Sequence, residues 1–226
     1  MTDGLRLDLH VHSRHSSDSR LTVEQLVDRL PYTGLRGFAL TDHNSVEGHG
    51  ELARLSRLHP SYVFLAGVEV STVEGHLLAY GVSEAPPAHR PILETIAWVR
   101  SHGGEPVLAH PFRWTHGVGG AVAGSAPVSA LEVRNGHSSE VANARAEVIA
   151  AQRTLGMTGG GDVHAILELG RAFTQFPEEA RTVDDLLEAL RRGRTQAGGR
   201  SLRFPGRVRL GLATGAKFLT RGFRTV

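Results

Sequence analysis

Residues 8–18, close to the amino terminus, hold three histidines and two aspartates. They overlap an alternation of leucines at positions 5, 7 and 9, which predicts a β-strand. Side chains two residues apart on a strand share a face, so His10 and His12 would project together, about 7 Å apart along the strand. Neutral imidazole is the commonest protein ligand for metal ions. We therefore predict a metal site at the end of this strand.

Similar side chains occur at the ends of further predicted strands. Short apolar runs over residues 37–40, 62–70, 75–81, 106–110 and 130–133, and a Gly-rich stretch at 157–161, favour strands or strand-like segments. The polar groups at the strand ends are His10 and His12, Asp42 and His43, Glu69, His110, Asn135 and His137, and Asp162 and His164. Six strands that deliver His, Asp or Glu to one rim indicate a site with several ligands.

Helical patterns alternate with these strands. They cover residues 23–30 after an N-cap at Thr22, 46–58, 91–100, 140–155 after an N-cap at Ser139, and 183–192, whereas residues 115–127 read as a loop. This alternation predicts an α/β fold with a largely parallel sheet, and about seven strands favour a closed or nearly closed barrel. Functional residues in such barrels lie at the carboxyl ends of the strands.

The composition narrows the classes of protein and site. The 226 residues include 40% hydrophobic and 21% charged residues, no long apolar run and no amino-terminal signal core, so we expect no membrane span and no export. Cysteine is absent, which excludes disulfides, thiolate metal ligands and a cysteine nucleophile and fits a cytoplasmic protein. From residue 191 onward there are ten Arg or Lys and no Asp or Glu. We predict one domain over residues 1–197 and a basic extension over 198–226.

Eight motifs occur in a characteristic order. They are Asp-Leu-His-Val-His-Ser (8–13), Ser-Asp (17–18), Leu-Thr-Asp-His-Asn (40–44), Gly-Val-Glu-Val-Ser (67–71), His-Leu-Leu-Ala-Tyr (76–80), Ala-His-Pro (109–111), Leu-Glu-Val-Arg-Asn (131–135) and Gly-Gly-Asp-Val-His (160–164). In these motifs the chain resembles the polymerase-and-histidinol-phosphatase (PHP) superfamily of metal-dependent phosphoesterases. The resemblance covers residues 5–197 and implies a distorted (β/α)7 barrel.

The resemblance also implies a centre of two or three divalent metal ions. The first ion would be held by His10, His12, Glu69 and Asp162. Glu69 would bridge to a second ion, which His110 and either His137 or Asn135 would also hold. The third ion would take His43, His164 and either His15 or Asp18. Donor sets of His, Asp and Glu suit zinc, manganese or iron.

The remaining candidate residues surround these ligands. Asp8 and Asp42 are expected to orient imidazoles, as is Asn135 if it does not bind metal. The candidates for substrate binding are Arg14, His76, Arg113 and Arg134. No protein nucleophile is required, because a metal-bound hydroxide would attack phosphorus.

These residues are compatible with three functions. The favoured one is hydrolysis of phosphate monoesters of small metabolites or nucleotides. The second is a nuclease acting on single-stranded or 3′-ended nucleic acid, aided by the basic extension. The third is a non-catalytic PHP module, which the nearly complete ligand set disfavours. Substrate identity, metal identity and oligomeric state are left open by the sequence.

Overall fold

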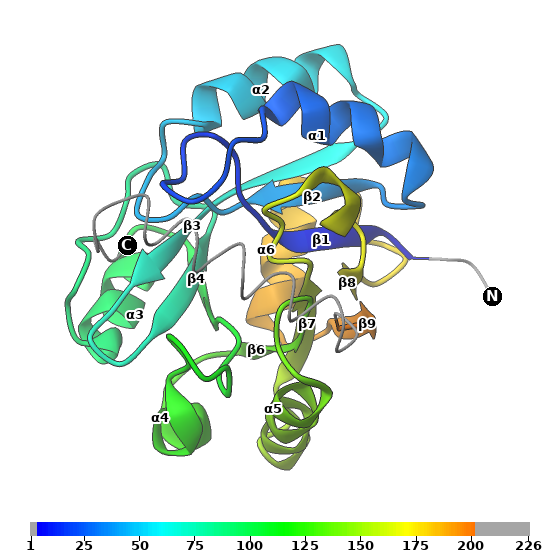
Figure 1. The fold of residues 1–226 in the computed structure, drawn as a ribbon. Helices are drawn as coiled ribbons and strands as arrows, with labels where there is room; N and C mark the ends of the chain where they lie inside the picture. The colour runs from blue at the N-terminus through cyan, green and yellow to red at the C-terminus, as the bar shows by residue number, and fades with distance from the viewer. Residues whose placement is uncertain (1–3, 202–226) are drawn as a thin grey trace.

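The computed structural model describes residues 4–201, where nine strands form one curved sheet (Figure 1). The strands are β1 (Arg6–Val11), β2 (Gly37–Leu40), β3 (Val63–Ser71), β4 (His76–Tyr80), β5 (Glu105–Leu108), β6 (Ala130–Asn135), β7 (Gly156–Gly160), β8 (Ala172–Gln175) and β9 (Gln196–Gly199). The helices are α1 (Val23–Arg29), α2 (His49–Leu58), α3 (Ile92–Ser101), α4 (Gly119–Ser125), α5 (Glu140–Gln152) and α6 (Val183–Arg191), with 3-10 turns η1 (Leu30–Tyr32) and η2 (Ile166–Glu168).

The sheet curls until its two edges nearly meet. The strand order is β7-β6-β5-β4-β3-β2-β1-β8-β9, so β7 and β9 are the edge strands. Across the seam, the backbone amide of Gly159 donates to Thr174 Oγ1 at 2.9 Å, and that of Met157 donates to the Thr195 carbonyl at 3.2 Å. These contacts close the gap, and the predicted distorted barrel is confirmed.

The prediction of a largely parallel sheet is wrong. Four strand pairs are parallel and four are antiparallel among the described residues. The connection from β3 to β4 spans only residues 72–75, and Thr72 donates to the Gly75 carbonyl through both its amide and its hydroxyl. So short a connection requires the chain to reverse direction. His76, at the amino end of β4, therefore lies at the same rim as the carboxyl end of β3.

Three elements were not expected. Residues 115–127 contain α4 rather than only a loop, and the sequence lacks an amphipathic pattern there because Gly and Ala dominate. The strands β8 and β9 were missed since both are short and β9 reads Gln-Ala-Gly-Gly. β8 pairs with β1, and β9 pairs with β8. This pairing stabilises two strands that their own sequences do not predict. The predicted domain limit at residue 197 falls within β9.

The predicted helix caps are confirmed. Thr22 Oγ1 accepts from the amide of Gln25, whose side chain accepts from the Thr22 amide, and Ser139 accepts from Ala142. Two bounds differ from the predictions by three residues: α2 begins at His49 instead of residue 46, and α5 ends at Gln152 instead of residue 155. The other bounds of the predicted helices agree within one residue. α1 and α2 pack together over one side of the barrel (Figure 1).

The barrel interior is apolar towards the end where β1 begins and polar at the opposite rim. Leu7 and Leu9 of β1 pack inside with residues of β2–β6 and α6, whereas Val11 packs outside against α1 and α2. The pairing of β1 with β2 is irregular between Asp8 and Val11, so the alternation of side chains changes face there. After this irregularity His10 and His12 point to the interior, above the leucines.

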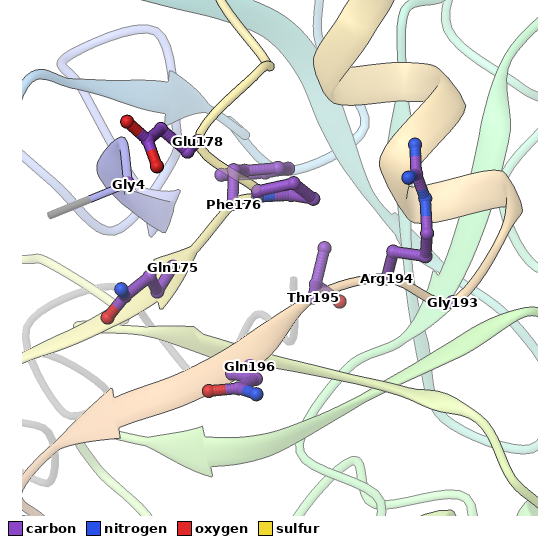
Figure 2. Close-up of a pocket in the computed structure, with 9 residues that line it drawn as sticks. Gly4, Gln175, Phe176, Glu178, Gly193, Arg194, Thr195 and Gln196 are labelled. Atoms are coloured by element: carbon purple, nitrogen blue, oxygen red, sulfur yellow. The ribbon is translucent and has the colours of Figure 1, made fainter. Parts of the chain in front are cut away.

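A hollow of about 400 Å³ opens at the other end of the barrel (Figure 2). It lies where the chain enters β1, leaves β8 and enters β9, with Phe176 and Thr195 on its walls and Arg194 to one side. Arg194 Nη1 also pairs with Glu179 Oε1 at 3.0 Å. The lining within residues 4–201 includes none of the predicted ligands, so this hollow is separate from the predicted metal site.

In the described part of the chain, no helix has both the length and the apolar character needed to cross a bilayer.

Candidate metal centre

Histidines and carboxylates from most strands of the barrel meet at the polar rim. They are delivered by β1, the segments after β2, β5 and β7, the carboxyl half of β3 and the start of β4. The rim residues that lie in mutual contact are His10, His12, Asp18, His43, Glu69, His76, His110, Asp162 and His164. His110 and Asp162 have φ of +28° and +54°, a conformation that non-glycine residues adopt rarely and mostly where function requires it.

The first group lies deepest. His10 Nε2 and His12 Nε2 are 3.0 and 3.1 Å from Glu69 Oε2, and 3.8 and 3.5 Å from Asp162 Oδ1. All four side chains are buried. Among residues 4–201 neither Nε2 atom has a partner in hydrogen-bond geometry. Buried nitrogens left without donors or acceptors, facing two carboxylates, fit a metal ion as their shared partner.

The second group uses the other oxygen of Glu69. His76 Nδ1 and His110 Nε2 lie 2.7 and 3.0 Å from Glu69 Oε1. Each Glu69 oxygen therefore faces its own set of imidazoles, the arrangement that a carboxylate bridging two metal ions requires. The resemblance implied His137 or Asn135 beside His110, and His76 was a candidate for substrate binding. In the structure His76 lies beside His110, with their ring centroids 5.5 Å apart.

The third group contains one of the two alternatives, His15 and Asp18. Asp18 Oδ2 lies 2.6 Å from His164 Nε2 and 3.4 Å from His43 Nε2, and His12 completes the set. His15 instead faces Glu51 at 3.1 Å and Glu47 at 3.8 Å, on the side of α2. The structure brings Asp18, and not His15, into the cluster.

The charges of the cluster are strongly coupled. Burial favours neutral His12, but the Asp162 and Glu69 carboxylates outweigh burial and raise the pKa of His12 to about 10. Burial likewise favours neutral Glu69, yet the imidazoles of His10, His43 and His76 hold the pKa of Glu69 well below its usual range. Metal-free His12 therefore keeps its proton at neutral pH, and an incoming metal ion must displace it.

Glu132 orients the first group, a role that the sequence did not assign to it. Its Oε1 lies 2.9 Å from His10 Nδ1, and its Oε2 accepts from the His110 amide at 2.8 Å and from Asn135 Nδ2 at 3.1 Å. A carboxylate on the second nitrogen of a ligand imidazole fixes the ring and raises its basicity. The available signal was a single acidic residue between apolar neighbours on β6.

The carboxylates of Asp8 and Asp42 accept hydrogen bonds from backbone amides. Asp8 accepts from the amides of Gly161 at 2.7 Å, Gly170 at 3.0 Å and His10 at 3.2 Å, and burial raises its pKa to about 7. Asp42 accepts from the amide and hydroxyl of Ser13 at 2.5 and 2.8 Å. These bonds hold the loops that carry the histidines, whereas the expected contact was with imidazoles.

We expect Glu132→Gln to weaken metal binding about 10- to 100-fold, because the carboxamide cannot support imidazole basicity as a carboxylate does. Isothermal titration of metal-free protein measures the affinity. Glu147→Gln on α5 is the matched control, since Glu147 pairs with Arg134 outside the cluster at 3.3 Å. Equal affinities in the two variants would contradict the assigned role.

His137 lies beside the third group, and Asn135 lies beside the first. His137 Nε2 is 3.4 Å from Glu168 Oε1, and His137, His164 and Glu168 form a further set whose ligand atoms approach one another. Asn135 Nδ2 donates to Asp162 Oδ2 at 3.2 Å, and its Oδ1 accepts from the His137 amide at 2.9 Å. Glu168 was missed because it lies on η2, in a segment without a clear strand or helix pattern.

The three arginines predicted to bind substrate have different surroundings. Arg113 Nη1 forms a short ion pair with Asp162 Oδ2, so its cation lies in the cluster. Arg14 pairs with Glu51 at 3.3 Å and is more than half exposed. Arg134 pairs with Glu140 and Glu147 of α5, because its side chain leaves the strand on the outer side of the barrel. Only Arg113 of these three contacts a cluster residue.

Two protein-family models match the chain in succession. The PHP domain matches residues 8–97, and a PHP-associated family matches residues 140–195. The protein belongs to the PHP superfamily. The residues matched by the PHP domain include the candidate ligands from β1 to β4, and those matched by the PHP-associated family include Asp162 and His164.

Curated relatives share parts of this PHP protein. A 3′,5′-nucleoside bisphosphate phosphatase of Chromobacterium violaceum is 38% identical over 86 residues, which cover 36% of this chain and 30% of that protein. An uncharacterised protein of Methanocaldococcus jannaschii is 28% identical over 187 residues, covering 77% of this chain and 71% of its own length. The phosphatase match is thus confined to under a third of that enzyme.

Solved structures share the fold. PsfC from Pseudomonas syringae superimposes with a TM-score of 0.70 at 19% identity, over 97% of this chain and 99% of PsfC. A protein from Bifidobacterium adolescentis, provisionally named a metal-dependent phosphoesterase, gives 0.61 at 18% identity, over 89% and 98% of the two chains. Endonuclease Q bound to a duplex with an abasic lesion gives 0.62 at 19% identity, over 82% of this chain and 56% of its own. At these identities the likeness establishes the barrel alone.

Proposed function

We propose that the protein is a metal-dependent phosphoesterase that hydrolyses phosphate monoesters of small metabolites or nucleotides. The observation that carries the proposal is the position of Glu69, whose two oxygens each face a separate set of imidazoles. Such a carboxylate suits a centre in which neighbouring cations act on one phosphoryl group.

The residues present fit two or three divalent ions. The first would be held by His10, His12, Glu69 and Asp162, and the third by Asp18, His43 and His164. We assign the second to Glu69, His76 and His110, because both imidazoles face Glu69 Oε1. Zinc, manganese and iron suit this donor set of imidazole and carboxylate. Bound there, such ions would supply an activated water at neutral pH and neutralise phosphoryl oxygens.

The chain's own groups would position the substrate. The Arg113 guanidinium already lies against Asp162 in the cluster, and a planar cation there can donate two hydrogen bonds to a phosphate. Glu132 and Asp8 hold the strands and loops that carry His10 and Asp162. Transfer of a phosphoryl group to water requires that the groups around the phosphate are held rigidly in position.

The choice of substrate class has support on both sides. The bisphosphate phosphatase relative favours a small phosphorylated nucleotide, and nucleic acid is the alternative, since endonuclease Q shares the fold. We favour small monoesters, because the match to the bisphosphate phosphatase has 38% sequence identity, whereas the match to endonuclease Q has 19%. A cytoplasmic location stays a prediction.

A phosphatase panel with metal analysis tests the proposal. The full chain, loaded with manganese or zinc, is assayed on histidinol phosphate, nucleoside mono- and bisphosphates and short oligonucleotides. We expect turnover of at least one monoester and its loss in a His10→Ala/His12→Ala double variant. Cleavage of oligonucleotides alone would favour the nuclease. A metal-loaded protein inactive on the whole panel would favour the non-catalytic module.

A further inference from the structure

One tryptophan at the rim has a side chain without a hydrogen bond or ring contact to any residue in 4–201. Trp114 is 100% exposed, in the loop between β5 and α4. Aromatic side chains usually bury most of their area, and a fully exposed indole leaves a large apolar surface in water. Ligand sites are lined largely by apolar and aromatic side chains, so an accessible indole next to a site is available for contact with a ligand.

The loop that carries this indole is well anchored. The Arg113 amide donates to the His110 carbonyl at 3.0 Å, and the Gly119 amide donates to the Pro111 carbonyl at 2.9 Å. Phe112 packs against the outer core, and the Arg145 guanidinium covers its ring at 4.4 Å from the centroid. Because both flanks are held, exposure of Trp114 is a feature of an ordered loop.

Residues on both sides of Trp114 contact the metal centre. Arg113 pairs with Asp162, and the His116 ring stacks on the His76 ring with centroids 4.5 Å apart and planes 14° apart. The His116 carbonyl also accepts from the His76 amide at 3.0 Å. Consecutive Cα atoms lie about 3.8 Å apart, so the indole starts within two residues of both contacts. A phosphate at the centre would leave the rest of the substrate near this loop.

We propose that Trp114 stacks on a planar ring of the substrate, such as a nucleobase, and so selects phosphate esters that carry one. This inference rests on the proposed phosphoesterase function and adds its specificity. A flat, fully accessible indole suits a planar π-system, because stacking needs area and no fixed hydrogen-bond pattern. The metal centre, when loaded, would hold the phosphate end of the substrate, and Trp114 would hold the planar end.

The test compares two phosphate monoesters that differ only in the base. Adenosine 5′-monophosphate carries a base, and ribose 5-phosphate does not. We expect Trp114→Ala to raise KM for the nucleotide about tenfold relative to KM for ribose 5-phosphate, with kcat for the nucleotide little changed. Trp114→Phe keeps an aromatic face and should recover most of the loss. Equal changes in KM for both esters, or none, would overturn the assignment.

The matched control is Tyr32→Ala. Tyr32 is an aromatic residue that is 76% exposed on η1, before the amino end of β2 and therefore at the opposite end of the barrel. We expect this variant to leave the ratio of the two KM values unchanged. The same shift in Tyr32→Ala and Trp114→Ala would mean that any lost surface aromatic produces it, and would also overturn the assignment.

The fluorescence of Trp114 tests stacking independently of phosphoesterase activity. The chain has two tryptophans, and Trp98 packs on the His102 ring at 3.6 Å between centroids. In Trp98→Phe, loaded with metal, saturable quenching by adenosine 5′-monophosphate but not by ribose 5-phosphate would support stacking even if neither ester is hydrolysed. Failure to hydrolyse any ester counts against the phosphoesterase proposal, and absence of quenching counts against Trp114.

Discussion

Replacement of Glu69 by Gln is expected to lower kcat/KM by about 10³-fold or more and to reduce the number of bound metal ions. The carboxylate faces His10, His12 and His43 through Oε2, and His76 and His110 through Oε1. A carboxamide keeps the shape but removes the charge and one of the two anionic donors. Charge stabilisation by metal ions is worth several kcal/mol in such reactions, and each 1.36 kcal/mol is tenfold in rate.

Metal content and kinetics of the Glu69→Gln protein measure this effect together. The control is Glu94→Gln, since Glu94 of α3 forms an exposed pair with Arg90, before the helix, at 2.8 Å. Circular dichroism and melting of both variants check that they fold. A Glu69→Gln protein with wild-type activity and full metal content would contradict a bridging role for this residue.

Removal of metal by a chelator is expected to abolish activity and lower the melting temperature by about 10 °C. An ion that binds only the folded state stabilises it by about 4 kcal/mol at a thousand times its Kd. A chain of this size shifts by about 2–4 °C per kcal/mol. The fold should survive, because the metal-free carboxylates face imidazoles that can carry protons, as the raised pKa of His12 and the lowered pKa of Glu69 indicate.

Calorimetry and activity of the dialysed protein, before and after metal is restored, follow the two effects. Manganese or zinc should restore both, whereas calcium, which prefers oxygen ligands, should restore neither at a site rich in imidazole. A dialysed protein free of metal that melts at the original temperature and retains activity would remove the metal centre from the mechanism.

Much of the site followed from residue type and strand position. His10, His12, Glu69, Asp162 and His164 were predicted from apolar runs that end in polar groups, and the structure brings all five to one rim. The signal is local, because a short apolar strand and the polar group at its end are adjacent in the chain.

This local signal could not decide between candidate residues that lie close together in the sequence. Asp18 and His15 are three residues apart in one polar loop, and only the fold turns Asp18 toward His164 while His15 meets α2. His76 was assigned to the substrate because a β-strand pattern does not reveal the direction of its strand. The antiparallel return of β4 places it beside Glu69.

The sequence by itself determined the kinds of ligand, the order of the strands that carry them and the barrel class. The tertiary structure decided which imidazoles and carboxylates lie together and which carboxylate orients them, as Glu132 does for His10. It also decided the face of β1 on which the histidines lie, through an irregular pairing with β2. These features depend on contacts between residues far apart in the chain, and periodicity within one segment carries no information about them.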